Sequence, residues 1–409
     1  MKQLLRISAT LFAVAISLSI AQAQTRYIDP VFDSVEVIQD VFYGSAVGYN
    51  GLSTNLEFDF YAPAGDTETH RPLIILQHGG FFVSGTNDDP YVTLIGMEMA
   101  KRGYAVASIE YRLGVNLGAP NLEVEFSKAA VRAIQDAKGA VRFFRESVAQ
   151  GNPYAISAEA IIQSGYSSGG IAAIHAAQFD GSEPIPGWLD TAITELGGLE
   201  GSIGNPSISS ESIAVVNFVG GILSPDMLEA SDVPMISIHS IDDDVVPYDS
   251  GMVQYLGSDI IYLYGSAPMH ARAQDLGLTN QLLTFNQVGH YPLDSLELHD
   301  TIFQSIGAFL YNLPIGLGNP ELAETPALRI WPNPVSVSQQ LSIQLSAPLT
   351  RTVAIPYAIW DVTGSACLRG DALLHSNSPG IFTIPLEGLK PGAYVLYVDG
   401  YLRQPIIVR

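Results

Sequence analysis

The sequence of 409 residues has little basic charge, almost no cysteine and only one long apolar run. Lysine and arginine together number 19 against 41 aspartates and glutamates, which gives a formal net charge of −22. Nucleic acid is excluded as an expected partner, because binding phosphates requires basic patches. Cys367 is the single cysteine, so no intramolecular disulfide can form and a cysteine nucleophile is excluded from the rest of the chain.

Histidine is also sparse, with 8 residues and no pair at the H-x-x-x-H spacing of metal ligands. We therefore expect no metal site. No motif indicates a cofactor either.

The single long apolar run lies at the N-terminus. Lys2 and Arg6 precede an apolar stretch from Ile7 to Ile20, and Ala21-Gln22-Ala23 follows it. This order predicts a secretory signal peptide over residues 1–23 with an A-x-A cleavage site, and thus an exported protein. No other segment is long enough to be a transmembrane helix. Loss of Lys2 and Arg6 lowers the formal net charge from −22 to −24.

Residues 24–313 alternate between strand and helix patterns, which predicts an α/β domain with a mostly parallel sheet. The strand patterns are Leu56–Pro63, Leu73–Gly80, Tyr104–Arg112, Ile213–Gly221, Pro234–Ser240 and Leu282–Val288. The first alternates and suits an antiparallel edge strand, whereas continuous apolar runs suit strands buried on both faces. The helix patterns are Tyr91–Arg102, Val124–Gln150 and Asp294–Tyr311.

The composition and the secondary-structure pattern of the chain change near Leu313. Residues 314–325 are rich in proline and glycine and predict a linker. Residues 326–409 contain short alternating segments and no long helix pattern, which predicts a small all-β sandwich.

One short motif carries the chemistry of the first domain. The run from Ile161 to Ala177 reads as a buried strand, a turn with the pattern G-x-S-x-G and a helix of small residues. In this setting Ser167, between Gly165 and Gly169, is a candidate nucleophile on a sharp strand-to-helix turn. The N-terminus of the following helix provides N–H groups for a developing anion.

A serine nucleophile needs a base and an acid that orients the base. His290 lies after the last strand pattern and before the last helix pattern, and it is the candidate base. The acid candidates are the adjacent Asp242, Asp243 and Asp244, in a loop that follows another buried strand pattern. His239, at the end of that strand, could brace the acid loop.

The run from His78 to Phe82 reads HGGFF directly after a buried strand pattern. Glycines let the backbone approach a substrate oxygen, since no Cβ obstructs it. We expect an oxyanion hole formed by the N–H groups of Gly80 or Phe81 together with that of Ser168.

Aromatic residues accompany both motifs. Phe82 and Tyr166 are candidate substrate-binding residues because they adjoin the HGG turn and the nucleophile. Packing roles are equally compatible with this placement.

These motifs give the span from about Asp40 to Leu313 a resemblance to the α/β-hydrolase carboxylesterases. The matching segments are DFYAPAGD, RPLIILQHGGFFVSG, SIEYRLG and GYSSGG, in this order. The resemblance implies a catalytic triad of Ser167, Asp243 and His290, with Asp243 selected by the D-x-x-V-P spacing. Phe81 replaces the third glycine that many such esterases have, and its side chain could line the acyl pocket.

The C-terminal segment resembles the sorting domains of type IX secretion in Bacteroidetes. The matching features are WPNPV, DVTG, LKPGAYVLYV and a short final strand that ends at Arg409. The resemblance implies the type IX machinery as a partner, and a product that is secreted or attached to the cell surface.

The function expected from these observations is a secreted serine esterase that hydrolyses small or polymer-linked carboxylic esters through an acyl-enzyme. It could hydrolyse polyesters, as cutinases do, or remove feruloyl or acetyl groups from polysaccharide. A serine peptidase of the prolyl-oligopeptidase type shares the order of the triad, but it usually carries a large N-terminal domain. The remaining alternative is a non-catalytic adhesion or binding protein, which an intact triad disfavours.

Overall fold

The computed structural model describes residues 25–313, 329–331, 335–336, 340–344, 353–361, 366–374, 381–386, 388–398 and 404–409. The chain divides into two units, Met1–Asn312 and Leu313–Arg409, and each is described here by itself. The predicted signal peptide at 1–23 and the predicted linker at 314–325 lie outside the described residues.

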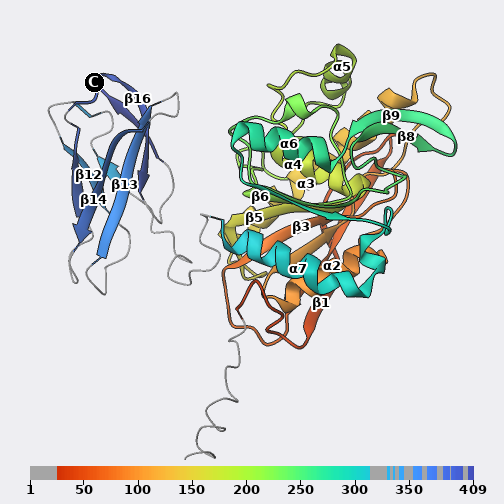
Figure 1. Cartoon of the computed structure of the whole chain (residues 1–409), viewed down its shortest axis with the longest axis horizontal. Helices are drawn as coiled ribbons and strands as arrows, with labels where there is room; N and C mark the ends of the chain where they lie inside the picture. Colours follow the sequence, from red (N-terminus) through yellow and green to blue (C-terminus); the bar gives the residue numbers. More distant parts are fainter. Residues whose placement is uncertain are drawn as a thin grey trace, which may run out of the picture. The chain divides into compact units, whose positions relative to one another are not determined.

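A central sheet of 8 strands forms the core of the first unit, in the order β1-β2-β4-β3-β5-β6-β7-β10 (Figure 1). Its strands are β1 (Val35–Val47), β2 (Ser53–Pro63), β3 (Arg71–Gln77), β4 (Ala105–Ile109), β5 (Ile156–Tyr166), β6 (Ala214–Phe218), β7 (Met235–Ser240) and β10 (Asn280–Phe285). β1, β2 and β4 pair antiparallel, and every pairing from β4 to β10 is parallel. The predicted α/β class with a mostly parallel sheet is confirmed.

Helices cover both faces of this sheet, so every residue of β3, β4, β6 and β7 is buried. Figure 1 shows α2 and α7 on one face and α3, α4 and α6 on the other. The helices are α2 (Pro90–Lys101), α3 (Leu122–Ala149), α4 (Ser168–Gln178), α5 (Gly187–Glu195), α6 (Ser266–Leu276) and α7 (Leu296–Tyr311). No helix in this part of the chain has the length and apolar character that a membrane crossing requires.

Two features of the first unit differ from the sequence expectation. The strand predicted at the edge, Leu56–Pro63, is the second strand, because β1 pairs along its outer side. Most residues of β1 are exposed, so this strand carries no clear alternation of apolar and polar residues. A two-stranded sheet of β8 (Ser250–Tyr255) and β9 (Ser258–Tyr264) was also not anticipated.

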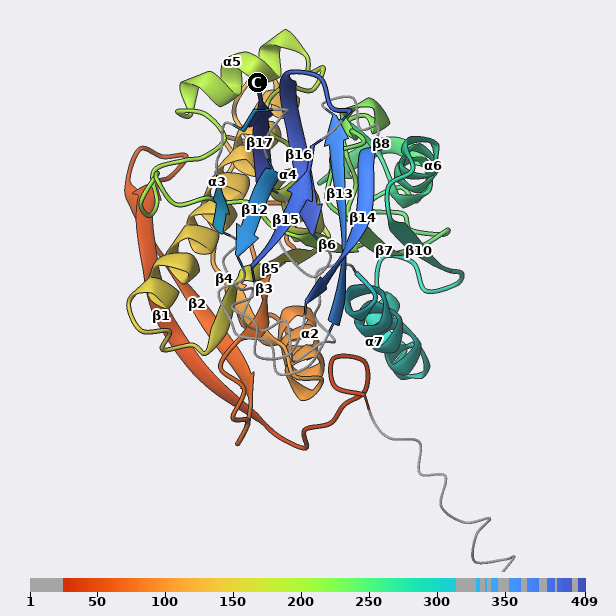
Figure 2. The same ribbon diagram turned by 90° about the vertical axis from the view of Figure 1, so that its left-hand side faces the viewer.

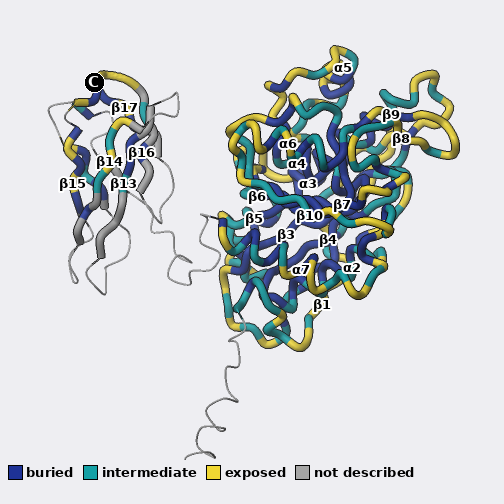
Figure 3. Tube along the Cα trace, viewed as in Figure 1, coloured by how far each residue is buried: buried dark blue, intermediate teal, exposed yellow. Residues whose placement is uncertain are grey.

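The hairpin of β8 and β9 turns through Leu256 and Gly257, whose φ angles are 50° and 78°. Two central residues with positive φ are typical of the type I′ turn that joins two-residue hairpins. Figure 3 shows exposed residues along the outer end of this hairpin, whereas buried residues concentrate in the central sheet and the helices beside it. One face of the hairpin therefore packs against the rest of the first unit, and the other face is exposed.

The second unit is all-β, as predicted for this part of the chain, and Figure 2 shows its strands running side by side. One sheet contains β11 (Arg329–Trp331), β12 (Gln340–Gln344) and β15 (Ile381–Pro385). The other contains β13 (Val353–Asp361), β14 (Ala366–Leu374), β16 (Gly392–Val398) and β17 (Gln404–Val408). All strand pairings within the two sheets are antiparallel. A single hydrophobic cluster includes residues of both sheets, such as Ile343, Ile359, Leu396 and Ile406.

Candidate active site

Ser167 occupies a sharp turn between the end of β5 and the start of α4. Its φ and ψ of 58° and −121° are unusual for a residue with a side chain. The turn is held on both sides, because the Ser167 N–H donates to Phe218 O at 2.9 Å and the Ile171 N–H donates to Ser167 O at 3.0 Å. Such backbone strain costs about 1–3 kcal/mol and persists where the surrounding structure fixes it, which happens most often at functional sites.

The two glycines of the motif leave room for this turn. A Cβ on Gly165 would lie 2.1 Å from Gly169 O, and a Cβ on Gly169 would lie 2.2 Å from Gln77 O. Both atoms belong to the backbone, which cannot give way without moving a strand or the helix. The pattern G-x-S-x-G is thus a requirement of how β3, β5 and α4 pack.

We expect Gly169→Ala to destabilise the first unit by about 1–3 kcal/mol, the usual range for overpacking a buried site. Thermal unfolding would measure this loss. Gly187→Ala is the matched control, because a Cβ on Gly187 would contact nothing within 4 Å. Equal unfolding temperatures for the two variants would contradict the packing argument.

The structure brings Ser167, His290 and Asp243 together at the edge where the parallel strands end. Ser167 Oγ lies 2.8 Å from His290 Nε2, and His290 Nδ1 lies 2.7 Å from Asp243 Oδ2. All three residues are buried. Nucleophile, base and acid are thus joined by two hydrogen bonds in the arrangement that serine catalysis requires.

Asp243 is held as an ionised acceptor. Its Oδ1 accepts the N–H groups of Val245 and Val246 at 2.9 and 3.0 Å, while Oδ2 faces both His290 and His239. Burial alone would raise the pKa of Asp243, but the hydrogen bonds from His239 and His290 outweigh it and hold this pKa well below its usual range. Asp243 is therefore a carboxylate at neutral pH.

The other two acid candidates are exposed. Asp242 accepts the N–H groups of Gln287 and Gly289 at 2.9 and 3.3 Å, so it ties the acid loop to the loop that carries His290. Of the three aspartates, Asp243 is the one hydrogen-bonded to His290.

His239 braces the acid, as its position at the end of a buried strand suggested. Its Nε2 lies 3.1 Å from Asp243 Oδ2 and 3.0 Å from Val246 O. Both partners are acceptors, so Nε2 carries a proton and donates it. Nδ1 lies 2.8 Å from Ser266 Oγ, which completes a fully buried network.

We expect His239→Ala to lower kcat by about tenfold to a hundredfold. A hydrogen bond to a charged group is worth about 1.5–3 kcal/mol, and roughly 1.4 kcal/mol corresponds to tenfold in rate. KM should change little, because His239 lies beneath the site and lines neither cavity beside Ser167. Steady-state kinetics separate the two parameters, with His239→Gln, which keeps a donor, as the variant that restores part of kcat. A rise in KM at constant kcat would argue against this positioning role.

The predicted oxyanion residues surround Ser167. Gly79, Gly80 and Phe81 border a cavity that Ser167 and His290 also border; its volume is about 340 Å³ and we term it the open cavity. Gly80 has a φ of 111°, and a Cβ there would lie 2.0 Å from Ser84 O. Phe81 also has a positive φ, 57°, which is rare for an aromatic residue. Ser168 begins α4, where N–H groups and the helix dipole favour negative charge.

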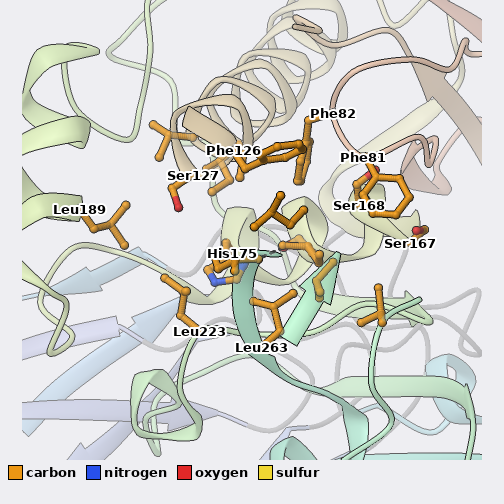
Figure 4. A pocket seen from close by; sticks show the side chains of 18 of the residues that line it. Phe81, Phe82, Phe126, Ser127, Ser167, Ser168, His175, Leu189, Leu223 and Leu263 are labelled. Carbon is orange, nitrogen blue, oxygen red and sulfur yellow. Dashed lines mark hydrogen bonds between the residues drawn. The ribbon is translucent and has the colours of Figure 1, made fainter. Parts of the chain in front are cut away.

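A second cavity adjoins Ser167 and is almost wholly apolar (Figure 4). Phe81 borders both cavities, Phe82 lines the apolar one, and Tyr166 lines the open one. Both predicted substrate-binding residues are thus within the site. Tyr166 has a further contact, because its hydroxyl donates to His290 O at 2.6 Å.

Further aromatic residues border the site, and Tyr291 among them was not identified from the sequence. Tyr91 stacks on Tyr166 with ring centroids 4.6 Å apart, and Tyr291 stacks on Tyr91 at 5.8 Å. The apolar cavity is lined by α3 and by the β8–β9 hairpin, which lie far from Ser167 in sequence. No local motif marks these residues. Within the described part of the chain, no cluster of His, Cys, Asp or Glu side chains could hold a metal ion.

One known protein family matches part of the first unit. The BD-FAE family model matches residues 58–222, which include the HGGFF loop and Ser167 and end before Asp243. No curated protein shows a significant match. The central sheet and the sharp turn at Ser167 define an α/β-hydrolase fold, and the class of protein that the site and the family match support is a carboxylic ester hydrolase.

Solved structures with a similar fold include a truncated carbohydrate esterase from gut microbiota. It is 20% identical with a TM-score of 0.47, and the match covers 68% of this chain and 98% of that one. Apo esterase 2 of Thermogutta terrifontis is 20% identical with a TM-score of 0.44, and the match covers 68% of this chain and 92% of that one.

Proposed function

We propose that this protein hydrolyses carboxylic esters through a Ser167–His290–Asp243 triad and an acyl-enzyme intermediate. The observation that carries the proposal is the unbroken hydrogen-bonded chain from Ser167 Oγ through the imidazole to the Asp243 carboxylate. These hydrogen-bonded side chains lie beside the open cavity of about 340 Å³, which a substrate can enter. A non-catalytic binding protein has no need for such an arrangement.

The reaction follows from the positions of the three side chains. His290 Nε2 takes the proton of Ser167 as Oγ attacks the ester carbonyl carbon, and Asp243 stabilises the imidazolium that forms. The N–H groups of the HGGFF loop and of Ser168 stabilise the oxyanion. His290 then gives its proton to the departing alkoxide, which leaves as the alcohol. Water, deprotonated by the same imidazole, attacks the acyl-enzyme, and the acid is released as His290 returns this proton to Ser167 Oγ.

Hydrolysis of p-nitrophenyl acetate alongside a prolyl peptide p-nitroanilide tests this function. We expect release of p-nitrophenol and no release of p-nitroaniline. Turnover of the anilide without turnover of the ester would overturn the proposal in favour of the peptidase alternative.

We further propose that the chain is exported, with residues 1–23 as a signal peptide and residues 326–409 as a type IX sorting domain. The support is the charged and apolar pattern of the N-terminus and the motifs of the tail. Expression in a host with this secretion system, compared with a variant truncated after residue 325, tests the proposal. We expect the full chain in the medium or at the cell surface, starting at Gln24, and the truncated chain in the periplasm. Equal export of both forms would contradict the role of the tail.

A further inference from the structure

The two cavities beside Ser167 differ in their relation to the base. His290 borders the open cavity together with Tyr91 and Tyr291, but it does not border the apolar cavity. In the proposed mechanism His290 must reach the oxygen of the leaving alcohol, so the alcohol lies in the open cavity. The acyl group then extends to the other side of Ser167, into the apolar cavity.

The apolar cavity is walled by three elements that the chain brings together from distant positions. Its main lining residues are Phe126, Val131 and Ile134 of α3, Ile171 of α4, and Val253, Ile260 and Leu263 of the β8–β9 hairpin. Beyond the serines at its mouth, the polar side chains in this lining are Ser127 and His175. Burial lowers the pKa of His175, so the ring is neutral. Such a lining stabilises an aliphatic group and offers little to an acetyl group or a sugar.

The depth of the cavity can be measured along α4. Ser167, Ile171 and His175 succeed one another at intervals of one helical turn and all border the cavity. At 1.5 Å per residue they span about 12 Å. An extended chain advances about 3.5 Å for every three bonds, so this depth accommodates roughly ten bonds. Figure 4 shows the lining continuing from Ser167 at one end to Leu189 at the other.

The width of the apolar cavity suits a single polymethylene chain. The centre of a water molecule can occupy about 70 Å³ of this cavity. Spread over about 12 Å and widened by the 1.4 Å radius of water, this volume gives a channel of about 2.8 Å radius. A polymethylene chain fits in such a channel without moving the walls.

We propose that the apolar cavity is an acyl channel and that the enzyme prefers esters of straight-chain acids with about eight to ten carbons. The proposal rests on the esterase function and adds the substrate class. Each buried methylene contributes about fourfold in affinity, so the preference over acetyl esters should be large. Phe81, which borders both cavities, separates the acyl side from the alcohol side.

Rates of hydrolysis of p-nitrophenyl esters from acetyl to hexadecanoyl, below their micelle concentrations, test the proposal. We expect kcat/KM to rise at least tenfold from acetyl to octanoyl and to fall beyond decanoyl. A flat profile, or a maximum at acetyl, overturns the acyl channel and leaves the esterase function intact. No hydrolysis of any ester overturns both.

Neighbouring residues of β8 supply a matched pair of variants. Val253 lines the channel and is 3% exposed, whereas Met252 points outward and is 46% exposed. Val253→Trp should lower kcat/KM for octanoyl at least tenfold more than for acetyl, and Met252→Trp should change neither. Leu263→Ala, which widens the channel, should shift the maximum to longer chains even if Val253→Trp fails to fold. An unchanged profile in Leu263→Ala, or equal losses for acetyl and octanoyl in a folded Val253→Trp, would refute the channel.

Discussion

Ser167→Ala should lower kcat for ester hydrolysis by about 10⁴-fold to 10⁶-fold, the range found when a triad nucleophile is removed. The substitution deletes the attacking oxygen and leaves His290 and Asp243 in place. The residual rate would come from the oxyanion donors and from substrate binding. Single-turnover kinetics with a p-nitrophenyl ester measure this loss.

A companion variant controls for folding. Ser167 has a φ of 58°, which glycine adopts without strain and alanine does not. Ser167→Gly should therefore be as inactive as Ser167→Ala but more stable than it by about 1 kcal/mol in denaturant unfolding. An inactive Ser167→Ala with an unfolding curve like that of the wild type excludes misfolding as the cause. Activity above one tenth of the wild type in either variant would contradict the assignment of the nucleophile.

Asp243→Asn should lower kcat by about 10⁴-fold, because the amide replaces one of the two accepting oxygens with an NH₂ group, which only donates. In the wild type, His239 Nε2 and His290 Nδ1 both face Oδ2. If Oδ1 still accepts from the Val245 and Val246 N–H groups, the NH₂ group takes the place of Oδ2 and faces His290. His290 Nδ1 would then have to accept a hydrogen bond from this NH₂ group. The proton would then sit on Nε2, which could no longer take the proton of Ser167.

The matched control is Asp244→Asn, at the adjacent exposed position, for which we expect wild-type activity. Asp242→Asn should have a modest effect, because Asp242 supports the His290 loop through two backbone N–H groups. Since hydrogen bonds hold the pKa of Asp243 below its usual range, acidification to about pH 5 should not protonate this carboxylate. Loss of activity in Asp244→Asn with full activity in Asp243→Asn would show that the acid is wrongly assigned.

Asp243 also couples the active site to stability. Its pKa is lower in the folded protein than in the unfolded chain, so its contribution to stability is complete above the unfolded value of about 4. That contribution is lost as the pH falls from there through the folded value.

The parts of the site that lie on local motifs could be predicted from the sequence. Ser167 was identifiable because strand, turn and helix follow one another within a short run, and His290 because it follows the last strand pattern. The choice among Asp242, Asp243 and Asp244 rested on resemblance, because three adjacent aspartates are equivalent in composition. Only folding distinguishes them, by burying Asp243 between two histidines and exposing the others.

The elements that the sequence did not predict depend on contacts between distant segments. β1 is exposed along most of its length and is held by its pairing with β2, so its own residues give little signal. The wall of the apolar cavity forms where the hairpin of β8 and β9 packs near α3, more than one hundred residues earlier in the chain. Its lining residues are ordinary apolar side chains, and only their convergence beside Ser167 gives them a role.

The most direct test of the account is labelling with a fluorophosphonate, followed by mass spectrometry of the peptides. These reagents phosphonylate a serine whose hydroxyl is activated by a neighbouring base. We expect one adduct, on Ser167, with labelling strongly slowed in His290→Ala and blocked by a saturating ester substrate. An adduct on another serine, or ester hydrolysis that continues at full rate after Ser167 is modified, would contradict the central claim.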